Sequence, residues 1–528
     1  MPVNCTPLLK EAGMRRESVV RPIAWMMIAT ALNSLATFGR EALSAAYFGA
    51  SVQTDAFNVG VAITGFALLI LSPLSDVFVP VYVDYLARDR HEDVQYILNA
   101  VGTFLLVLLG VSAVVLFAFA DPLVGLYASG FDVEGRRLTV DLLRILIPFA
   151  VFSGLATYSI LILTARKDFV WIGLAPVVGT VAAIGILWRL APSLGIHALA
   201  WGFVGGGAVE ILVLGWGLRQ QKIRFRPTLR VRESLGLLGK LSLFMLAIRY
   251  VGQISEIVDR NMLSHLSAGS IAALAFARNI YSVPFQVFTL GITRVVITYF
   301  SWDAAHEDAD GLKRNLSLSI RIGAFFMLPA TVGLILLRNP VIQVLYERGE
   351  FTAADTQATA TMLAWFALGL FAHAVLFITI RYFLSRKAVG RFAFITVLYV
   401  GCRVVFNLLF IKPLDHAAIA CSTALAGAMA AAVALLLIRR ELGALGGGYI
   451  ACTCLKASAA AFVMGGIVYL GGRSPFIQML PSYGQLGSLV AGGALVYLLA
   501  AYLIRLEELR LLIDLVRDRI KALMKGAG

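Results

Sequence analysis

Long apolar stretches recur along the whole chain and are separated by short polar connectors. A helix that crosses a bilayer needs about 20 apolar residues, and about fourteen stretches of the chain meet this requirement. Six of them lie at 22–46, 57–83, 96–119, 139–164, 169–190 and 196–217. The others lie at 237–264, 271–299, 316–337, 356–384, 389–411, 417–438, 451–471 and 482–504. The pattern predicts an all-α integral membrane protein with about 14 transmembrane helices.

The connector after the sixth stretch differs from the others because it is strongly basic. It contains Pro227 and a run of lysines and arginines: Arg219, Lys222, Arg224, Arg226, Arg230 and Arg232. Such a segment is too charged to cross a bilayer and marks a boundary between two halves. We therefore expect an N-terminal six-helix lobe (1–218), a basic cytoplasmic linker (219–235), a C-terminal six-helix lobe (236–440), and two additional helices with a cytoplasmic amphipathic tail (441–528).

Composition agrees with a membrane location and leaves little room for a soluble domain. Of the 528 residues, 59% are hydrophobic and only 14% are charged, whereas soluble domains carry roughly 25% charged residues. The net charge of +14 would suggest nucleic-acid binding in a soluble protein. In a membrane protein, positive charge collects in cytoplasmic loops. Basic pairs such as Arg166-Lys167 and Arg386-Lys387 fall on one side, which predicts that both termini are cytoplasmic.

Two short motifs recur at nearly the same distance and indicate an internal duplication. The segment that begins Ala50-Ser51-Val52 is similar to Gly269-Ser270-Ile271, an offset of 219 residues. The segments around Pro122 and Pro340 match at an offset of 218. Because six spans separate the copies, both halves should enter the membrane from the same side and be related by an axis along its normal, as in many transporters.

Charged side chains inside predicted spans are the strongest functional signal, because each costs roughly 2.5–3.5 kcal/mol at the bilayer centre. Under the offset of 219, Arg40-Glu41 in the first span corresponds to Asp259-Arg260 in the seventh. We expect the two ion pairs to flank a water-filled cavity lined by both halves. The alternative is that they fasten helices together or reach the headgroup layer.

The charged positions favour an anionic substrate, because arginine is in excess over carboxylates within the spans and its planar guanidinium binds phosphate through two hydrogen bonds. A phosphate-bearing substrate is therefore predicted. The candidate substrate-binding residues are Arg40, Glu41, Asp55, Asp259, Arg260, Arg278, Asn279 and Arg294.

Other chemistries lack their sequence signals. There is no GxxxxGK[ST] nucleotide-binding motif, and the six histidines are dispersed without metal-ligand spacing. No cofactor or metal is expected. The longest connectors on the non-cytoplasmic side, near 120–138 and 338–355, are too short for a catalytic domain, so the chain is not expected to be an enzyme.

At several motifs the sequence resembles the MviN/MurJ lipid II flippases of the multidrug and oligosaccharidyl-lipid exporter superfamily. Arg40-Glu41, Phe48-Gly49-Ala50 and Thr54-Asp55-Ala56-Phe57 are similar to the family's first helix and the start of its second. The segment Arg348-Gly349-Glu350-Phe351-Thr352 followed by Asp355-Thr356 is similar to a second family signature. The resemblance implies two six-helix lobes plus a C-terminal helix pair. It also implies alternating access that moves a polyprenyl-pyrophosphate-linked glycan from the inner to the outer leaflet.

The sequence departs from the family's pattern where substrate would bind. Ser34 and Leu68 stand where the peptidoglycan flippases carry arginines, and the family's Ala-Asp-Arg reads Ala277-Arg278-Asn279. An exopolysaccharide repeat unit is therefore an alternative to lipid II. Two further readings are a cation-coupled exporter of small amphiphiles and a noncatalytic or enzymatic partner in envelope synthesis. The carboxylates that could serve cation coupling are Asp55, Asp76, Glu210 and Glu256.

These readings share one cellular setting. They imply a bacterial-type inner membrane location and contact with the lipid bilayer, and the flippase prediction adds contact with the polyprenyl-pyrophosphate-linked glycan. Cell-envelope synthesis enzymes are candidate partners, and no nucleic acid is expected.

Overall fold

The computed structural model describes residues 6–71, 82, 91–223, 225–228 and 234–511. Within these ranges every regular element is a helix and no strand occurs. The predicted all-α class is therefore confirmed. Three sequence-based predictions lie outside the described residues: the carboxylate of Asp76, half of the bases of the linker (Arg224, Arg230 and Arg232) and the amphipathic tail after residue 511.

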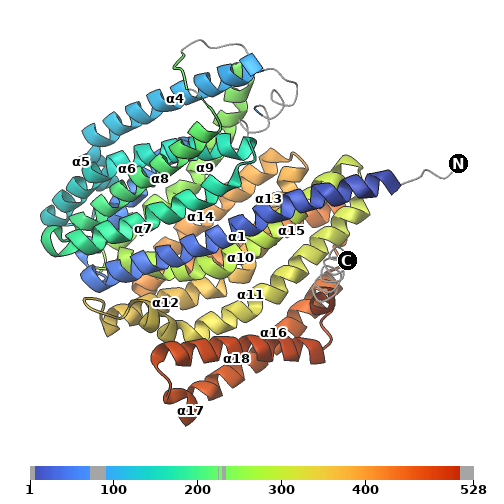
Figure 1. Cartoon of the computed structure of the whole chain (residues 1–528). Coiled ribbons are helices and arrows are strands. Elements are labelled where there is room, and N and C mark those ends of the chain that lie inside the picture. Colours follow the sequence, from blue (N-terminus) through green and yellow to red (C-terminus); the bar gives the residue numbers. More distant parts are fainter. Residues whose placement is uncertain (1–5, 72–81, 83–90, 224, 229–233, 512–528) are drawn as a thin grey trace. The chain divides into compact units, whose positions relative to one another are not determined.

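The chain forms two compact units, and each has its own packing. Unit 1 comprises Met1–Gln253 and Arg260–Ile271, and unit 2 comprises Ile254–Asp259 and Ala272–Gly528. The helices that lie wholly in unit 1 are α1 (Thr6–Phe48), α2 (Val52–Leu68), η1 (Leu69–Leu71), α4 (His91–Ala118), α5 (Ala120–Tyr127), α6 (Val133–Ala165), α7 (Phe169–Leu194) and α8 (His197–Gln220). Two helices contribute residues to both units: α9 (Ser234–Ser264) and α10 (Ser270–Ala305), of which only the first two residues belong to unit 1 (Figure 1).

Small residues let two helices of unit 1 approach closely. α7 packs along α8, and Gly179 faces Gly206 at their crossing. A Cβ atom added to Gly206 would lie 2.6 Å from the carbonyl oxygen of Gly179, and one added to Gly179 would lie 2.8 Å from that of Gly206. Close backbone contact between small residues is a main source of helix association in membranes, where lipid tails are as apolar as leucine.

Unit 2 contains the remaining helices. They are α11 (Ala309–Tyr346), α12 (Ala353–Leu368), α13 (Leu370–Ser385), α14 (Val389–Leu414), η2 (Asp415–Ala417), α15 (Ala418–Leu442), α16 (Gly447–Gly472), α17 (Pro475–Gln478) and α18 (Ser482–Leu503).

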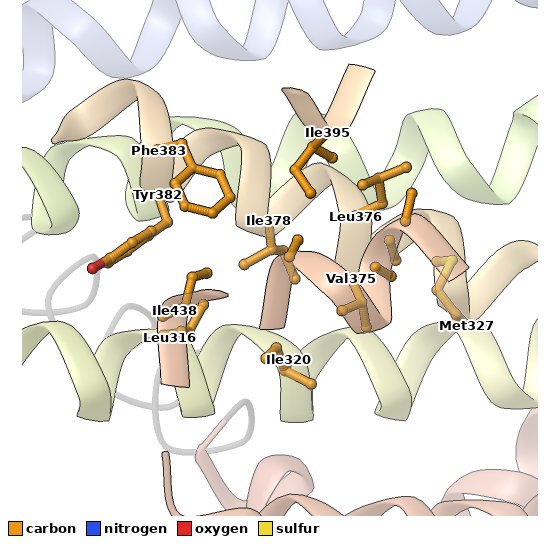
Figure 2. Close-up of a cluster of buried hydrophobic side chains, with 14 of the residues drawn as sticks. Leu316, Ile320, Met327, Val375, Leu376, Ile378, Tyr382, Phe383, Ile395 and Ile438 are labelled. Carbon is orange, nitrogen blue, oxygen red and sulfur yellow. The ribbon is translucent and has the colours of Figure 1, made fainter. Parts of the chain in front are cut away.

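The core of unit 2 lies among α11, α13, α14 and α15. Figure 2 shows this cluster, in which Leu316 and Ile320 of α11 lie near Ile378 and Val375 of α13 and Ile438 of α15. A second cluster joins α11 to the C-terminal helices α16 and α18. The extra helix pair is therefore packed against the rest of unit 2 through α11.

The predicted count of fourteen spans is not confirmed. The described residues contain ten helical segments that are long and apolar enough to cross a membrane, or eleven if one bent pair counts as a single span. That pair is α12 and α13, which were expected as one stretch at 356–384 and bend by 47° at Gly369. In the second predicted span, 57–83, α2 gives way to η1 after Leu68, and residues 72–81 are outside the described part.

Backbone dihedral angles support the predicted duplication. Three pairs of residues with positive φ are each 220 positions apart: Gly49 with Gly269, Lys167 with Lys387, and Gly195 with Asp415. The third pair follows α7 and α14, and its members have nearly the same conformation, with φ and ψ of 53° and −137° at Gly195 and 50° and −135° at Asp415. The two halves therefore share turns as well as motifs, within one residue of the offset expected from the sequence.

Asp415 adopts a conformation that favours glycine, so Asp415→Gly is expected to stabilise the protein. Non-glycine residues in such regions cost of order 1–3 kcal/mol. Part of this gain is offset by the greater backbone entropy of glycine in the unfolded chain, which leaves about 1 kcal/mol. Thermal unfolding in detergent measures the change, and the reciprocal variant Gly195→Asp should unfold at a lower temperature. Equal midpoints for all three proteins would contradict the strain argument.

Candidate functional site

Arg40 and Glu41 of α1 form an ion pair with each other, at 3.1 Å between Arg40 Nη2 and Glu41 Oε1. Both side chains are mostly buried, with 17% and 23% exposed. The guanidinium of Arg40 also lies 4.1 Å from the ring centroid of Phe203 on α8. Such a cation–π contact orients the guanidinium. Arg40 is thus held in place by one carboxylate and one ring, and its other N–H groups form no hydrogen bond with the described residues.

Asp55 has a structural role, because its carboxylate connects two turns of unit 1 through a hydrogen bond. Its side chain is 3% exposed, and its Oδ2 accepts a hydrogen bond of 2.7 Å from the backbone N–H of Gly269. Gly269 has a φ of 86° and lies so close to Ala50 that an added Cβ would be 2.1 Å from its carbonyl oxygen. The geometry therefore assigns Asp55 to the packing of the α1–α2 turn against the α9–α10 turn.

Further polar contacts within unit 1 lie next to the contact between Asp55 and Gly269. Gly130 donates its backbone N–H to Ser264 Oγ at 3.0 Å, and Ser129 Oγ lies 3.0 Å from His265 Nε2. Asn261 donates to the carbonyl oxygen of Leu126 at 3.0 Å. The end of α9 is thus bound to the turn between α5 and α6 by polar contacts.

Unit 2 contains a network of four charged side chains from three helices. Glu256 and Asp259 lie on α9, Arg278 on α10 and Arg403 on α14. Asp259 is fully buried and forms an ion pair with Arg403, which is 4% exposed. We call these four residues the four-charge network. It contains two carboxylates and two guanidinium groups, so its formal charge is zero.

Two polar side chains complete the buried part of the four-charge network. Asn407, one helical turn after Arg403, donates from Nδ2 to Asp259 Oδ1 at 2.7 Å. Arg403 Nη1 donates to Ser255 Oγ at 3.1 Å. A buried charge is tolerated when it is both paired and hydrogen-bonded, and Asp259 meets both conditions.

The other part of the four-charge network is accessible. Arg278 Nη1 lies 2.6 Å from Glu256 Oε2, and these side chains are 32% and 24% exposed. Arg278 Nη2 is 3.9 Å from Asp259 Oδ2. Glu256 also reaches Arg403, with Oε1 3.4 Å from both Nη1 and Nη2. Glu256 therefore bridges the two arginines.

Aromatic and imidazole rings lie beside one another in the same unit. His373 of α13 is 6.2 Å from Tyr281 of α10 and 6.1 Å from Tyr399 of α14, measured between ring centroids. Its Nδ1 lies 2.8 Å from the carbonyl oxygen of Gly369, at the bend between α12 and α13. The ring thus supplies a polar contact where the helix is interrupted.

The candidate residues from the sequence fall into both units. Unit 1 holds Arg40, Glu41, Asp55 and Arg260, and unit 2 holds Asp259, Arg278, Asn279 and Arg294. The structure pairs Asp259 with Arg403 and Asn407, which corrects the expectation that Asp259 and Arg260 pair as Arg40 and Glu41 do. Asn279 is half-buried, and its carbonyl oxygen accepts from Ser282. The side chain of Arg294 is outside the described residues.

Arg403 and Asn407 belong to this arrangement but are not among the substrate-binding residues predicted from the sequence. Their spacing of four residues places both on one face of a helix, and this was the available signal. The carboxylate that they bind, that of Asp259, lies 144 residues before Arg403 and 148 before Asn407, and no local pattern identifies it.

The chain is similar to known proteins along most of its length. The profile of the lipid II flippase MurJ family matches residues 44–481. A lipid II flippase MurJ from Burkholderia cenocepacia is 27% identical over 428 residues, which cover 78% of this chain and 82% of that protein. A probable lipid II flippase MurJ from Thermotoga maritima is 26% identical over 480 residues, which cover 89% of this chain and 93% of that protein.

Solved structures share the fold. A structure of lipid II flippase MurJ in an inward closed conformation has a TM-score of 0.76 at 23% identity and covers 91% of this chain and 98% of its own. An inward-facing multidrug resistance MATE family transporter of the MOP superfamily has a TM-score of 0.67 at 16% identity, with 78% and 95% covered. These identities show a common fold alone. The family profile spans more than four fifths of the sequence, and the chain therefore belongs to the lipid II flippase MurJ family.

Proposed function

We propose that this chain is a flippase that moves a polyprenyl-pyrophosphate-linked glycan from the inner to the outer leaflet by alternating access. The observation that carries the proposal is the match to the lipid II flippase family over residues 44–481. Multiple apolar helices fit a multi-pass membrane protein. The family is one of transporters, which agrees with the absence of a predicted catalytic domain.

The side chains available in the membrane suit a pyrophosphate headgroup. Arg40 and Arg278 are each partly exposed, and each is held by a neighbouring carboxylate. Guanidinium groups bind phosphate oxygens through charge-assisted hydrogen bonds. Together with Glu41, Asp55, Asp259, Arg260, Asn279 and Arg294, they make up the proposed substrate-binding set. Within this set we assign capture to Arg40 and Arg278 and packing to Asp55.

The multidrug exporter alternative has less support. The MATE family transporter shares the fold at 16% identity, and a likeness of fold does not indicate which substrate this chain transports. Of the carboxylates considered for cation coupling, Asp55 accepts a backbone hydrogen bond and Glu256 is paired with two arginines.

We propose that the transported glycan includes an exopolysaccharide-type repeat unit, because two expected arginines are replaced by uncharged residues. Ser34 Oγ donates to the carbonyl oxygen of Thr30 at 2.9 Å. Leu68 packs, half-buried, against the apolar cluster that contains Leu98 and Leu105. Neither position contributes positive charge, so the sugar and any attached peptide meet a different surface from that of the peptidoglycan flippases.

Complementation tests both the activity and the substrate. The gene is supplied to cells depleted of their own lipid II flippase, and survival and the exposure of lipid II on the outer leaflet are measured. We expect weak rescue at native expression and stronger rescue of a strain that lacks the flippase for an exopolysaccharide repeat unit. Full rescue of the first strain alone would contradict the alternative substrate, and rescue of neither strain by a correctly inserted protein would contradict the flippase assignment.

For topology, we propose an inner-membrane protein with both termini in the cytoplasm and a cytoplasmic linker at 219–235 between two six-helix lobes. Cell-envelope synthesis enzymes are the proposed partners. A single cysteine placed at Lys222, which is exposed, should react with an impermeant thiol reagent only after the cells are opened. Labelling of this cysteine in intact cells would show that the linker lies outside the cytoplasm and would contradict the proposed orientation.

A further inference from the structure

The four-charge network is divided between a sealed part and an accessible part. Asp259 and Arg403 are 0% and 4% exposed, whereas Glu256 and Arg278 are 24% and 32% exposed. Arg278 begins a polar face of α10 that continues with Ser282 and Gln286, whose side chains are joined by a hydrogen bond of 3.2 Å. Polar side chains that face lipid are costly, so this face is suited to water and to a polar ligand.

Glu256 occupies one of the terminal nitrogens of Arg278 that an anion would use. Its Oε2 lies 2.6 Å from Nη1 of Arg278, a distance typical of a strong charge-assisted hydrogen bond. A phosphate that binds a guanidinium through two oxygens uses two neighbouring N–H groups on one edge. On Arg278, the edge formed by Nη1 and Nη2 is the one that Glu256 and Asp259 approach. Binding of phosphate at this edge must therefore displace the carboxylate of Glu256.

The structure also provides a place for the displaced charge. Oε1 of Glu256 is already 3.4 Å from both terminal nitrogens of Arg403. Removing one member of a buried ion pair is costly because it leaves an uncompensated charge. Glu256 avoids this cost, since its carboxylate can leave Arg278 and remain paired with Arg403.

We infer that Glu256 is an internal stand-in for the phosphate of the substrate. In the empty transporter the carboxylate of Glu256 pairs with Arg278. When the pyrophosphate binds Arg278, this carboxylate moves toward Arg403. Its return to Arg278 then displaces the pyrophosphate and promotes release of the substrate. This inference rests on the proposed function and adds a residue that sets the strength of substrate binding. Glu256 acts through Arg278 and is a positioning residue.

The inference predicts that removal of the competing charge strengthens binding and slows release. The purified full-length protein in lipid nanodiscs is titrated with undecaprenyl pyrophosphate as the probe. Glu256→Gln should lower the Kd about tenfold, the effect of one charge-assisted hydrogen bond that no longer competes. Flipping measured in proteoliposomes should reach saturation at lower substrate concentration but with a lower maximal rate.

A matched control exists elsewhere in the chain. Glu441, at the end of α15, also bridges two arginines, Arg386 at 3.2 Å and Arg391, and it is 21% exposed. Glu441→Gln should leave both the Kd and the flipping rate unchanged. Glu256→Asp, whose shorter side chain withdraws the carboxylate from Arg278 but keeps the charge, should give an intermediate Kd and carries the test if Glu256→Gln does not fold.

The outcomes separate the inference from the proposed function. If the wild-type protein binds the probe, Arg278→Ala weakens binding, and both variants of Glu256 match the wild type, the stand-in role is wrong and the flippase assignment stands. If the folded wild-type protein does not bind the probe, the proposed function itself fails. Tighter binding by Glu256→Gln that disappears when Arg278→Ala is added would establish that Glu256 acts through this arginine.

Discussion

Arg403→Met is expected to lower the free energy of unfolding by about 3–5 kcal/mol, because it leaves the fully buried Asp259 without its main counter-charge. The remaining partners cannot replace it. Asn407 donates one hydrogen bond to Asp259, and Arg278 is 3.9 Å away and already paired with Glu256. A buried carboxylate in this position must accept a proton or expose itself to water, and either change disturbs the packing of α9 against α14.

Reversible unfolding in mixed detergent micelles measures this loss. Arg189→Met is the matched control, because Arg189 lies on α7 with an exposed side chain, and surface substitutions usually change stability by within about 0.5 kcal/mol. The double variant Arg403→Met/Asp259→Leu removes both charges and should recover most of the stability. A single variant as stable as the control would show that Asp259 and Arg403 are not paired in the membrane.

Helices and their duplication could be predicted from the sequence because both are local or repetitive signals. Apolar stretches of sufficient length dictate helices in a membrane, where every backbone N–H and C=O must be satisfied within the segment. The offset between the motifs near Ala50 and Gly269 indicated the repeat, and the matching turns at Gly195 and Asp415 support it. The bend at Gly369 was missed, since the stretch at 356–384 contains no proline and glycine alone does not end a helix.

The charged site could be predicted only in part. Arg40 and Glu41 are adjacent, and their ion pair was expected from the sequence. The partners of Asp259 come from a helix that begins 130 residues later, at Val389, and hydropathy does not indicate which distant helices touch. Asp55 illustrates a second difficulty. A carboxylate near the start of a helix is equally compatible with ligand binding and with a structural hydrogen bond, and its contact with Gly269 lies 214 residues away.

Arg278→Ala and Arg40→Ala are each expected to reduce flipping of the lipid-linked substrate by about 10- to 100-fold. A lost charge-assisted hydrogen bond to phosphate is worth roughly 1.5–3 kcal/mol, and each 1.4 kcal/mol corresponds to about a factor of ten in affinity. Flipping is measured with purified protein in proteoliposomes that contain a fluorescent polyprenyl-pyrophosphate glycan. Arg473→Ala is the control, because Arg473 lies at the end of α16 and stacks on Tyr469 at 4.3 Å.

The charge-neutral double variant Glu256→Gln/Arg278→Ala separates binding from folding. Arg278→Ala alone leaves two carboxylates for one guanidinium in the four-charge network, so loss of flipping could follow from instability. The double variant retains Asp259 with Arg403 and restores a formal charge of zero. We expect it to unfold at nearly the wild-type temperature and still to lack flipping. If the double variant transports normally, Arg278 and Glu256 serve only to hold α9 against α10, and substrate capture must be assigned to other arginines.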